Sequence, residues 1–168
     1  MPTFRVGQKV FYPPQGPCVI GAVVNKTVLG EAIPFYPISS LDEAAAAVLV
    51  PLHKLAGAAM RHLLPRSRIP TLLGHLNDSF SASKNWKQRV IDNDKLFASG
   101  SAFDLAQIVQ SLTDLGKTKE LSLRDRKSLE KARRFLICEI SEVLDESRDT
   151  AERQVDRALA RRKKTDPL

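Results

Sequence analysis

The period of the hydrophobic pattern changes near residue 65, and no other feature constrains the fold as much. Before this point the apolar residues form short runs separated by Pro and Gly, which is typical of β-strands joined by tight turns. We expect strands at residues 8–12, 18–24, 35–38 and 48–50, with turns at residues 13–16 and 28–31. Several short strands with turn residues between them predict a small β-barrel.

Beyond residue 65 the apolar residues recur every three or four positions, which is the period of helices that bury one face. Three helix starts are indicated by a capping residue followed three positions later by an acid. These starts lie at Ser101, Ser122 and Asp149. The second of them opens the longest expected helix, whose apolar stripe includes Leu136 and Ile140.

The length of 168 residues allows one mid-sized domain or two small ones, and the change of period favours two. We predict an α+β protein with a small β-barrel domain at residues 1–65, an all-α domain at 66–160 and a basic, disordered tail at 161–168. The excess of 26 Lys and Arg over 19 Asp and Glu gives a net charge of +7, which favours an anionic partner. Because both halves are basic, an anion-binding surface has to be a local feature.

No sequence feature points to an enzyme, a metal site or a membrane protein. His53, His62 and His75 have no acidic or cysteine partner at metal-ligand spacing, and the common nucleotide-binding and nucleophile motifs are absent. No apolar run approaches the ~18 residues that span a bilayer, and the first residues lack an export signal. Cys18 and Cys138 lie in apolar stretches and are expected to be buried, inert thiols. We therefore expect a cytoplasmic, non-enzymatic protein without a cofactor.

The only tryptophan, Trp86, lies in a basic stretch near an expected helix start, among Lys84, Lys87 and Arg89. An exposed indole at a helix end can wedge against a base step while neighbouring Lys and Arg neutralise phosphates. The spacing from Trp86 to Val90 also permits a place in the helical core, the commoner position for a lone tryptophan. Spacing alone leaves both interpretations open.

A second candidate surface lies on the helix that begins after Ser122. Residues 124–134 contain six basic and two acidic side chains. Lys127 falls on the face opposite the apolar stripe, and Arg126 and Arg133 flank that stripe. Such a face is usually solvated, and alternatively it tracks the phosphates of a nucleic acid.

The order of these features resembles the CarD/CdnL family of bacterial transcription regulators over nearly the whole chain. The motifs that carry the resemblance are Phe4-Arg-Val-Gly7, Val10-Phe-Tyr-Pro13, Val50-Pro51-Leu-x-Lys54, Asn85-Trp86-Lys-Gln-Arg89 and Leu121-Ser-x-x-Asp125-Arg126-Lys127. Each motif is only moderately specific, and their ordered set at fitting distances is what identifies the family.

The resemblance implies a Tudor-like (SH3-like) barrel that binds the β subunit of bacterial RNA polymerase, with Lys26 and Leu49 at polymerase-binding positions. It implies that the helical domain contacts promoter DNA at the upstream edge of the −10 bubble, in complexes with the housekeeping sigma factor. Trp86 would wedge into the minor groove there and stabilise the open complex. The DNA-contacting residues implied in this way are Trp86, Lys87, Arg89, Arg126, Lys127 and Arg133.

The chain departs from other members at a few of these positions. Leu49 stands where some members present a basic residue to the polymerase, and Gln88 and Ile91 stand where some carry basic residues toward DNA. We expect a monomer that associates with the nucleoid. The rival hypothesis is a protein–protein adaptor in which Trp86 is buried and DNA is not contacted, so the exposure of the indole distinguishes the two.

Overall fold

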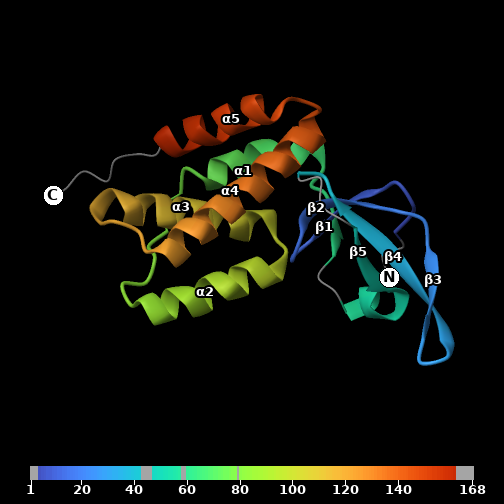
Figure 1. Ribbon diagram of the computed structural model, residues 1–168. Coiled ribbons are helices and arrows are strands. Elements are labelled where there is room, and N and C mark those ends of the chain that lie inside the picture. Colours follow the sequence, from blue (N-terminus) through green and yellow to red (C-terminus); the bar gives the residue numbers. More distant parts are fainter. Residues whose placement is uncertain (1–3, 43–46, 58–59, 79, 162–168) are drawn as a thin grey trace. The chain divides into compact units, whose positions relative to one another are not determined.

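The computed structural model describes residues 4–42, 47–57, 60–78 and 80–161. The chain divides into two compact units, Met1–Leu63 and Leu64–Leu168, so the division lies two residues before the predicted boundary. The first unit is an antiparallel sheet and the second is helical, which confirms the predicted α+β class (Figure 1). The predicted tail lies outside the described residues except for Arg161.

The described part of the first unit forms a six-stranded antiparallel sheet in the order β3-β4-β2-β1-β6, with β5 paired to β4. The strands are β1 (Lys9–Tyr12), β2 (Gly16–Ile20), β3 (Val24–Val28), β4 (Glu31–Ser40), β5 (Val48–Pro51) and β6 (Arg61–His62). A 3-10 helix, η1 (Leu52–Gly57), follows β5. The core beneath the sheet is built from inward-facing apolar side chains, among them Val10, Cys18, Ile20, Ile38 and Val50.

Two strand predictions need correction. The run expected as one strand at 18–24 ends at Ile20, and a separate strand, β3, begins at Val24. The piece expected at 35–38 is the middle of the longer β4, which contains Pro34 and Pro37. Each proline has a ladder partner on one side only, β3 for the first and β5 for the second, so the missing N–H is tolerated.

The described part of the second unit contains five α-helices. They are α1 (Ile69–His75), α2 (Trp86–Ser99), α3 (Ala102–Thr118), α4 (Leu123–Leu144) and α5 (Arg148–Ala160), and a 3-10 turn, η2 (Arg66–Arg68), precedes α1. Ser101 and Ser122 cap α3 and α4 as predicted, because each hydroxyl accepts from a backbone N–H of the first turn. The third cap is Ser147, two residues before the predicted Asp149, which instead lies in the first turn of α5.

The helical core lies between α3 and α4, which pack along each other, while α5 packs on α4 and both α1 and α2 pack on α3. The predicted stripe of α4 is buried at Ala132, Leu136 and Ile140, opposite a buried face of α3 that includes Ile108 and Leu112. None of the described helices combines the length and the apolar composition needed to cross a bilayer.

Candidate functional site

Trp86 is the first residue of α2 and is 61% exposed. The preceding Asn85 caps the helix, because its side-chain oxygen accepts from the backbone N–H of Lys87 at 3.0 Å. The ammonium of Lys87 lies 5.6 Å from the centre of the indole ring, within the range of a cation–π contact. The interpretation of Trp86 as core is therefore wrong, and so is the rival adaptor hypothesis in the form that required a buried indole.

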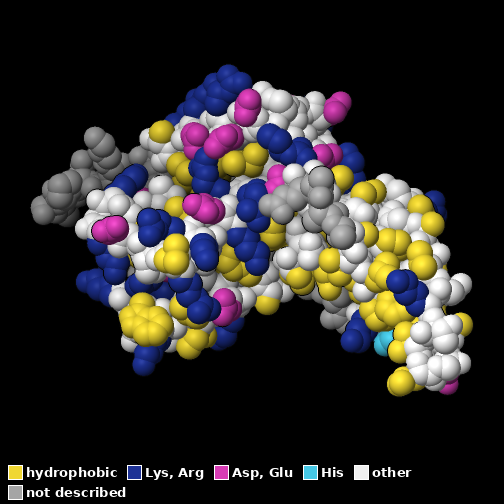
Figure 2. Space-filling model, viewed as in Figure 1, with side chains coloured by type: hydrophobic (Ala, Val, Ile, Leu, Met, Phe, Trp, Pro, Cys, Tyr) yellow, Lys and Arg dark blue, Asp and Glu magenta, His cyan; other side chains and the backbone are white. Residues whose placement is uncertain are grey.

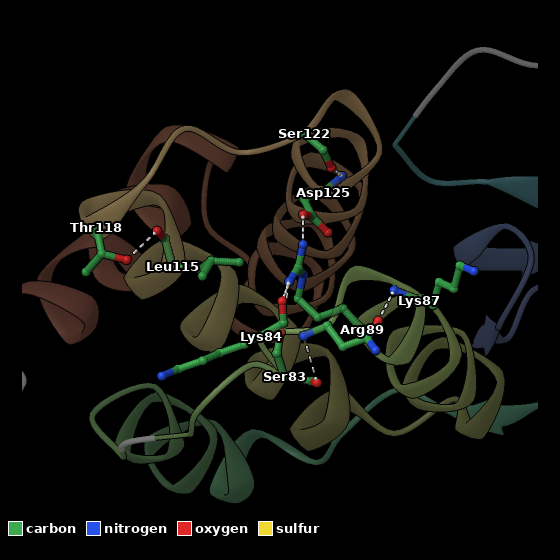
Figure 3. A network of polar contacts seen from close by, with 9 residues as sticks. Ser83, Lys84, Lys87, Arg89, Leu115, Thr118, Ser122 and Asp125 are labelled. Atoms are coloured by element: carbon green, nitrogen blue, oxygen red, sulfur yellow. Dashed lines mark hydrogen bonds and ion pairs between the residues drawn. The ribbon is translucent and has the colours of Figure 1, made fainter.

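A buried arginine fixes the start of α2 to the start of α4 (Figure 3). Arg89 is 3% exposed, and its guanidinium donates to the Asp125 carboxylate at 3.1 Å. The same group donates to the carbonyl oxygens of Ser83 at 2.9 Å and Lys84 at 3.1 Å. Asp125 is itself held in the first turn of α4, where its N–H donates to the Ser122 hydroxyl. One side chain thus joins the loop before Trp86 to the helix end that carries Arg126 and Lys127.

The role predicted for Arg89 needs correction. As a phosphate ligand it would have to reach solvent, whereas its side chain is buried and already donates to three oxygen atoms. In the sequence, Arg89 is one of several cations near Trp86. Its partner Asp125 is 36 residues away, so no local pattern indicates the ion pair between them. Asp125 was likewise not predicted as a residue of this site.

Arg126 and Lys127 are exposed on the first turns of α4, as expected for cations that contact phosphate. No ion pair involves either of them within the part of the chain that the structure describes. Beside them, an open groove of about 390 Å³ runs between α2 and α4, with Phe97 and Leu123 among its apolar lining. Basic and apolar side chains are interspersed over α2 and α4 on this face (Figure 2). This face can therefore accept an anion and an apolar group together.

Arg133 is less available than predicted. Its guanidinium donates to Glu152 at 3.0 Å and to Asp156 at 2.8 Å, both on α5. Its side chain is 24% exposed. These two ion pairs occupy the group in tying α4 to α5, so we place Arg133 outside the candidate DNA-contacting set.

The sheet brings Lys26 and Leu49 to one face. Residues paired across a ladder point to the same side, and Lys26 pairs with Ile33 of β4 while Leu49 pairs with Pro37. Ile33 and Pro37 are four residues apart on β4 and share a face. Lys26 is exposed and Leu49 half-buried, so the face offers one cation and an apolar surface.

Neither cysteine is available for chemistry. Cys18 and Cys138 are both fully buried, as predicted. Burial raises the pKa of the Cys18 thiol from 9.0 to about 12, so it stays protonated at neutral pH. Within the described residues, no group of three His, Cys, Asp or Glu side chains is arranged to hold a metal ion.

Comparison with known proteins gives the family. The family model for the CarD C-terminal domain matches residues 72–156, which include α2, α3, α4 and most of α5. The chain belongs to the CarD family. A protein of Bacillus subtilis (strain 168) described as "Putative transcription factor YdeB" is 28% identical over 142 residues, which cover 82% of this chain and 90% of that protein.

CarD-family proteins are non-enzymatic transcription factors, and membership of the family implies an interaction with RNA polymerase. The matched region contains Trp86, the Arg89–Asp125 pair and the exposed cations of α4. The CarD match therefore spans every helical residue of the candidate site. Lys26 and Leu49 lie before the matched region.

Proposed function

We propose that this CarD-family transcription factor stabilises the promoter open complex. In this proposal its sheet unit binds the β subunit of RNA polymerase, and its helical unit contacts DNA at the upstream edge of the bubble, where Trp86 enters the minor groove. The observation that carries the proposal is the 61% exposure of Trp86 on a helix end that a buried ion pair holds in place. Attachment to polymerase raises the effective concentration near DNA, so a modest DNA affinity suffices.

The helix end suits a wedge for energetic reasons. Opening a gap between two base pairs costs a few kcal/mol, and a flat apolar ring offsets part of this by filling the gap. Because Arg89 and Asn85 hold the start of α2, little conformational freedom of the indole-bearing turn remains to be lost on binding. Lys87, beside the ring, supplies positive charge at the point where the phosphates of a narrow groove approach.

Phosphate contacts are assigned to Lys87, Arg126 and Lys127. The positive end of the α4 dipole normally disfavours cations, so two unpaired cations in its first turns favour an anionic partner over a structural role. Cations and an apolar wedge carry no code for base edges. Sequence preference is therefore expected to follow how easily a step is unstacked.

Polymerase binding is assigned to the sheet unit, and specifically to β3. Every residue of β3 is exposed, and among the described strands it pairs with β4 alone, so its outer edge offers free main-chain donors and acceptors. Such an edge can add a strand from a partner. Lys26 at its centre favours an acidic residue on that partner. We expect Lys26→Glu to weaken binding to core polymerase, while Lys9→Glu, the same change on β1, leaves it unchanged; equal losses in the two variants would contradict the assignment.

The wedge is tested by Trp86→Ala in a paired measurement of open-complex lifetime and thermal stability. The lifetime should fall while polymerase binding persists, and unfolding free energy should change by less than ~1 kcal/mol, because an exposed ring contributes little to packing. Val6→Ala is the control, since Val6 is an apolar side chain with the same 61% exposure that lies in the sheet unit, and it should leave both the lifetime and the stability unchanged. A loss of ~3–5 kcal/mol of stability, as for a core aromatic, or an unchanged lifetime would refute the proposal.

A further inference from the structure

The turn that joins β3 to β4 holds a leucine where the backbone disfavours one. Leu29 and Gly30 form a two-residue loop, because Val28 pairs directly with Glu31. Their φ angles are 52° and 81°. Two positive values in succession define a type I′ hairpin turn, whose first position is usually Asn or Asp. Leucine takes this left-handed conformation only at an energetic cost, because its Cβ crowds the following carbonyl.

The side chain of Leu29 is also completely exposed, at 101% of its reference area. A single exposed leucine is ordinary on a protein surface. This one extends a larger apolar face, since Val24 and Val28 on β3 are 37% and 41% exposed. Their neighbours across the ladder on that face include Ile33 and Phe35 of β4, both half-buried. Both backbone strain and solvation therefore oppose leucine at this tip, and folding of this unit gains no buried contact from it.

We propose that Leu29 is an apolar anchor that enters a pocket on the β subunit of RNA polymerase, next to a strand that pairs with β3. This inference rests on the proposed function. The free edge of β3 selects a partner that presents an exposed strand. Lys26, on the same face as Val24 and Val28, favours an acidic side chain opposite it. The free main-chain edge of β3 favours a protein strand over DNA, because only a protein strand can pair with it. The partner surface is thus an acidic strand edge that ends beside an apolar pocket.

The discriminating variant is Leu29→Asn in the full chain, because it removes the apolar side chain and suits the turn better. Affinity for purified core RNA polymerase should fall at least about tenfold, as for a buried anchor residue. The melting temperature of the same variant should stay constant or rise, because asparagine adopts positive φ more readily than leucine. Leu29→Gly should behave in the same way. Val6→Asn is the matched control, since Val6 is 61% exposed in the same unit but outside the hairpin, and it should leave affinity unchanged.

The results of these measurements distinguish a failure of the Leu29 anchor from a failure of the proposed function on which it rests. If the unmodified chain does not bind core polymerase, the proposed function is wrong, and the partner proposed for Leu29 is refuted with it. A second outcome is that the unmodified chain binds and Lys26→Glu weakens binding, but Leu29→Asn does not. This result would refute the Leu29 anchor and leave the proposed function standing. If Leu29→Asn instead abolishes self-association in sedimentation experiments while polymerase binding persists, the hairpin tip contacts a second copy of the chain, and the proposal is overturned.

Discussion

The buried pair of Arg89 and Asp125 is expected to control both the stability of the helical unit and the position of Trp86. Arg89→Met keeps the apolar stem of the side chain and removes three hydrogen bonds, to Asp125 and to the carbonyl oxygens of Ser83 and Lys84. It also leaves the carboxylate of Asp125, a residue only 5% exposed, without its cation.

Removing one partner of a buried ion pair costs about 3–5 kcal/mol, because the remaining charge stays desolvated and unpaired. For a unit of this size the loss corresponds to a fall in melting temperature on the order of 10–20 °C. Asp125→Asn should cost less, since the two bonds from Arg89 to carbonyl oxygens remain. Exchanging the two residues should not restore stability, because an aspartate at position 89 cannot donate to those carbonyls.

The assay is chemical denaturation of the full chain followed by far-UV circular dichroism, which reports the helices. Arg124→Met is the matched control, because Arg124 lies beside Asp125 on α4 but is 63% exposed and 3.7 Å from Asp94. Such a surface pair is worth less than ~1 kcal/mol. If Arg89→Met costs no more than Arg124→Met, the buried pair does not hold these helix ends together and Arg89 returns to the set of candidate phosphate ligands.

Three further predictions concern the phosphates, the α4–α5 contact and the thiols. Arg126→Ala and Lys127→Ala should each lower the slope of log affinity against log salt by about one in DNA-binding titrations, with the melting temperature unchanged; a slope that stays constant would contradict phosphate contact. Arg133→Ala should leave that slope unchanged and lower stability modestly in thermal melts, because its two ion pairs to α5 are partly exposed. Cys18 should resist iodoacetamide at about pH 8 in the native chain and react readily in guanidinium, because burial raises its pKa to about 12; rapid native labelling in peptide mass spectrometry would disprove that burial.

The sequence predicted those elements whose signals are local. Ser101 and Ser122 could be recognised as caps because an N-cap bonds within its own first turn. The turn at residues 28–31 was predicted and lies there as Leu29 and Gly30. The strand β3 could not be predicted, because all five of its residues are exposed and no hydrophobic alternation marks it. Its structure comes from pairing with β4, which is a non-local interaction.

The candidate site was only partly predicted, again because its central contact joins residues that are far apart in the sequence. Periodicity searches look for apolar side chains, whereas the buried residues of α2 are Arg89 and Asn93. The fully buried positions of this helix are polar and its apolar residues Val90 and Leu96 are only half-buried, so the pattern gave no way to decide whether Trp86 faces the core. Arg89 resembled a surface cation because its neighbours in sequence are cations, and only the fold brings Asp125 to it. Burial of charged residues depends on such distant partners.

Contact between residue 86 and the melted promoter is measured most directly by photocrosslinking in the open complex. A benzophenone amino acid in place of Trp86 should crosslink to DNA at the upstream edge of the bubble, within complexes that also contain polymerase. The same group in place of Arg153, which is exposed on α5, is the positional control and should give no crosslink at the bubble edge. Crosslinks from position 86 to protein alone, or to DNA far from the bubble edge, would contradict the assignment of Trp86 as the wedge.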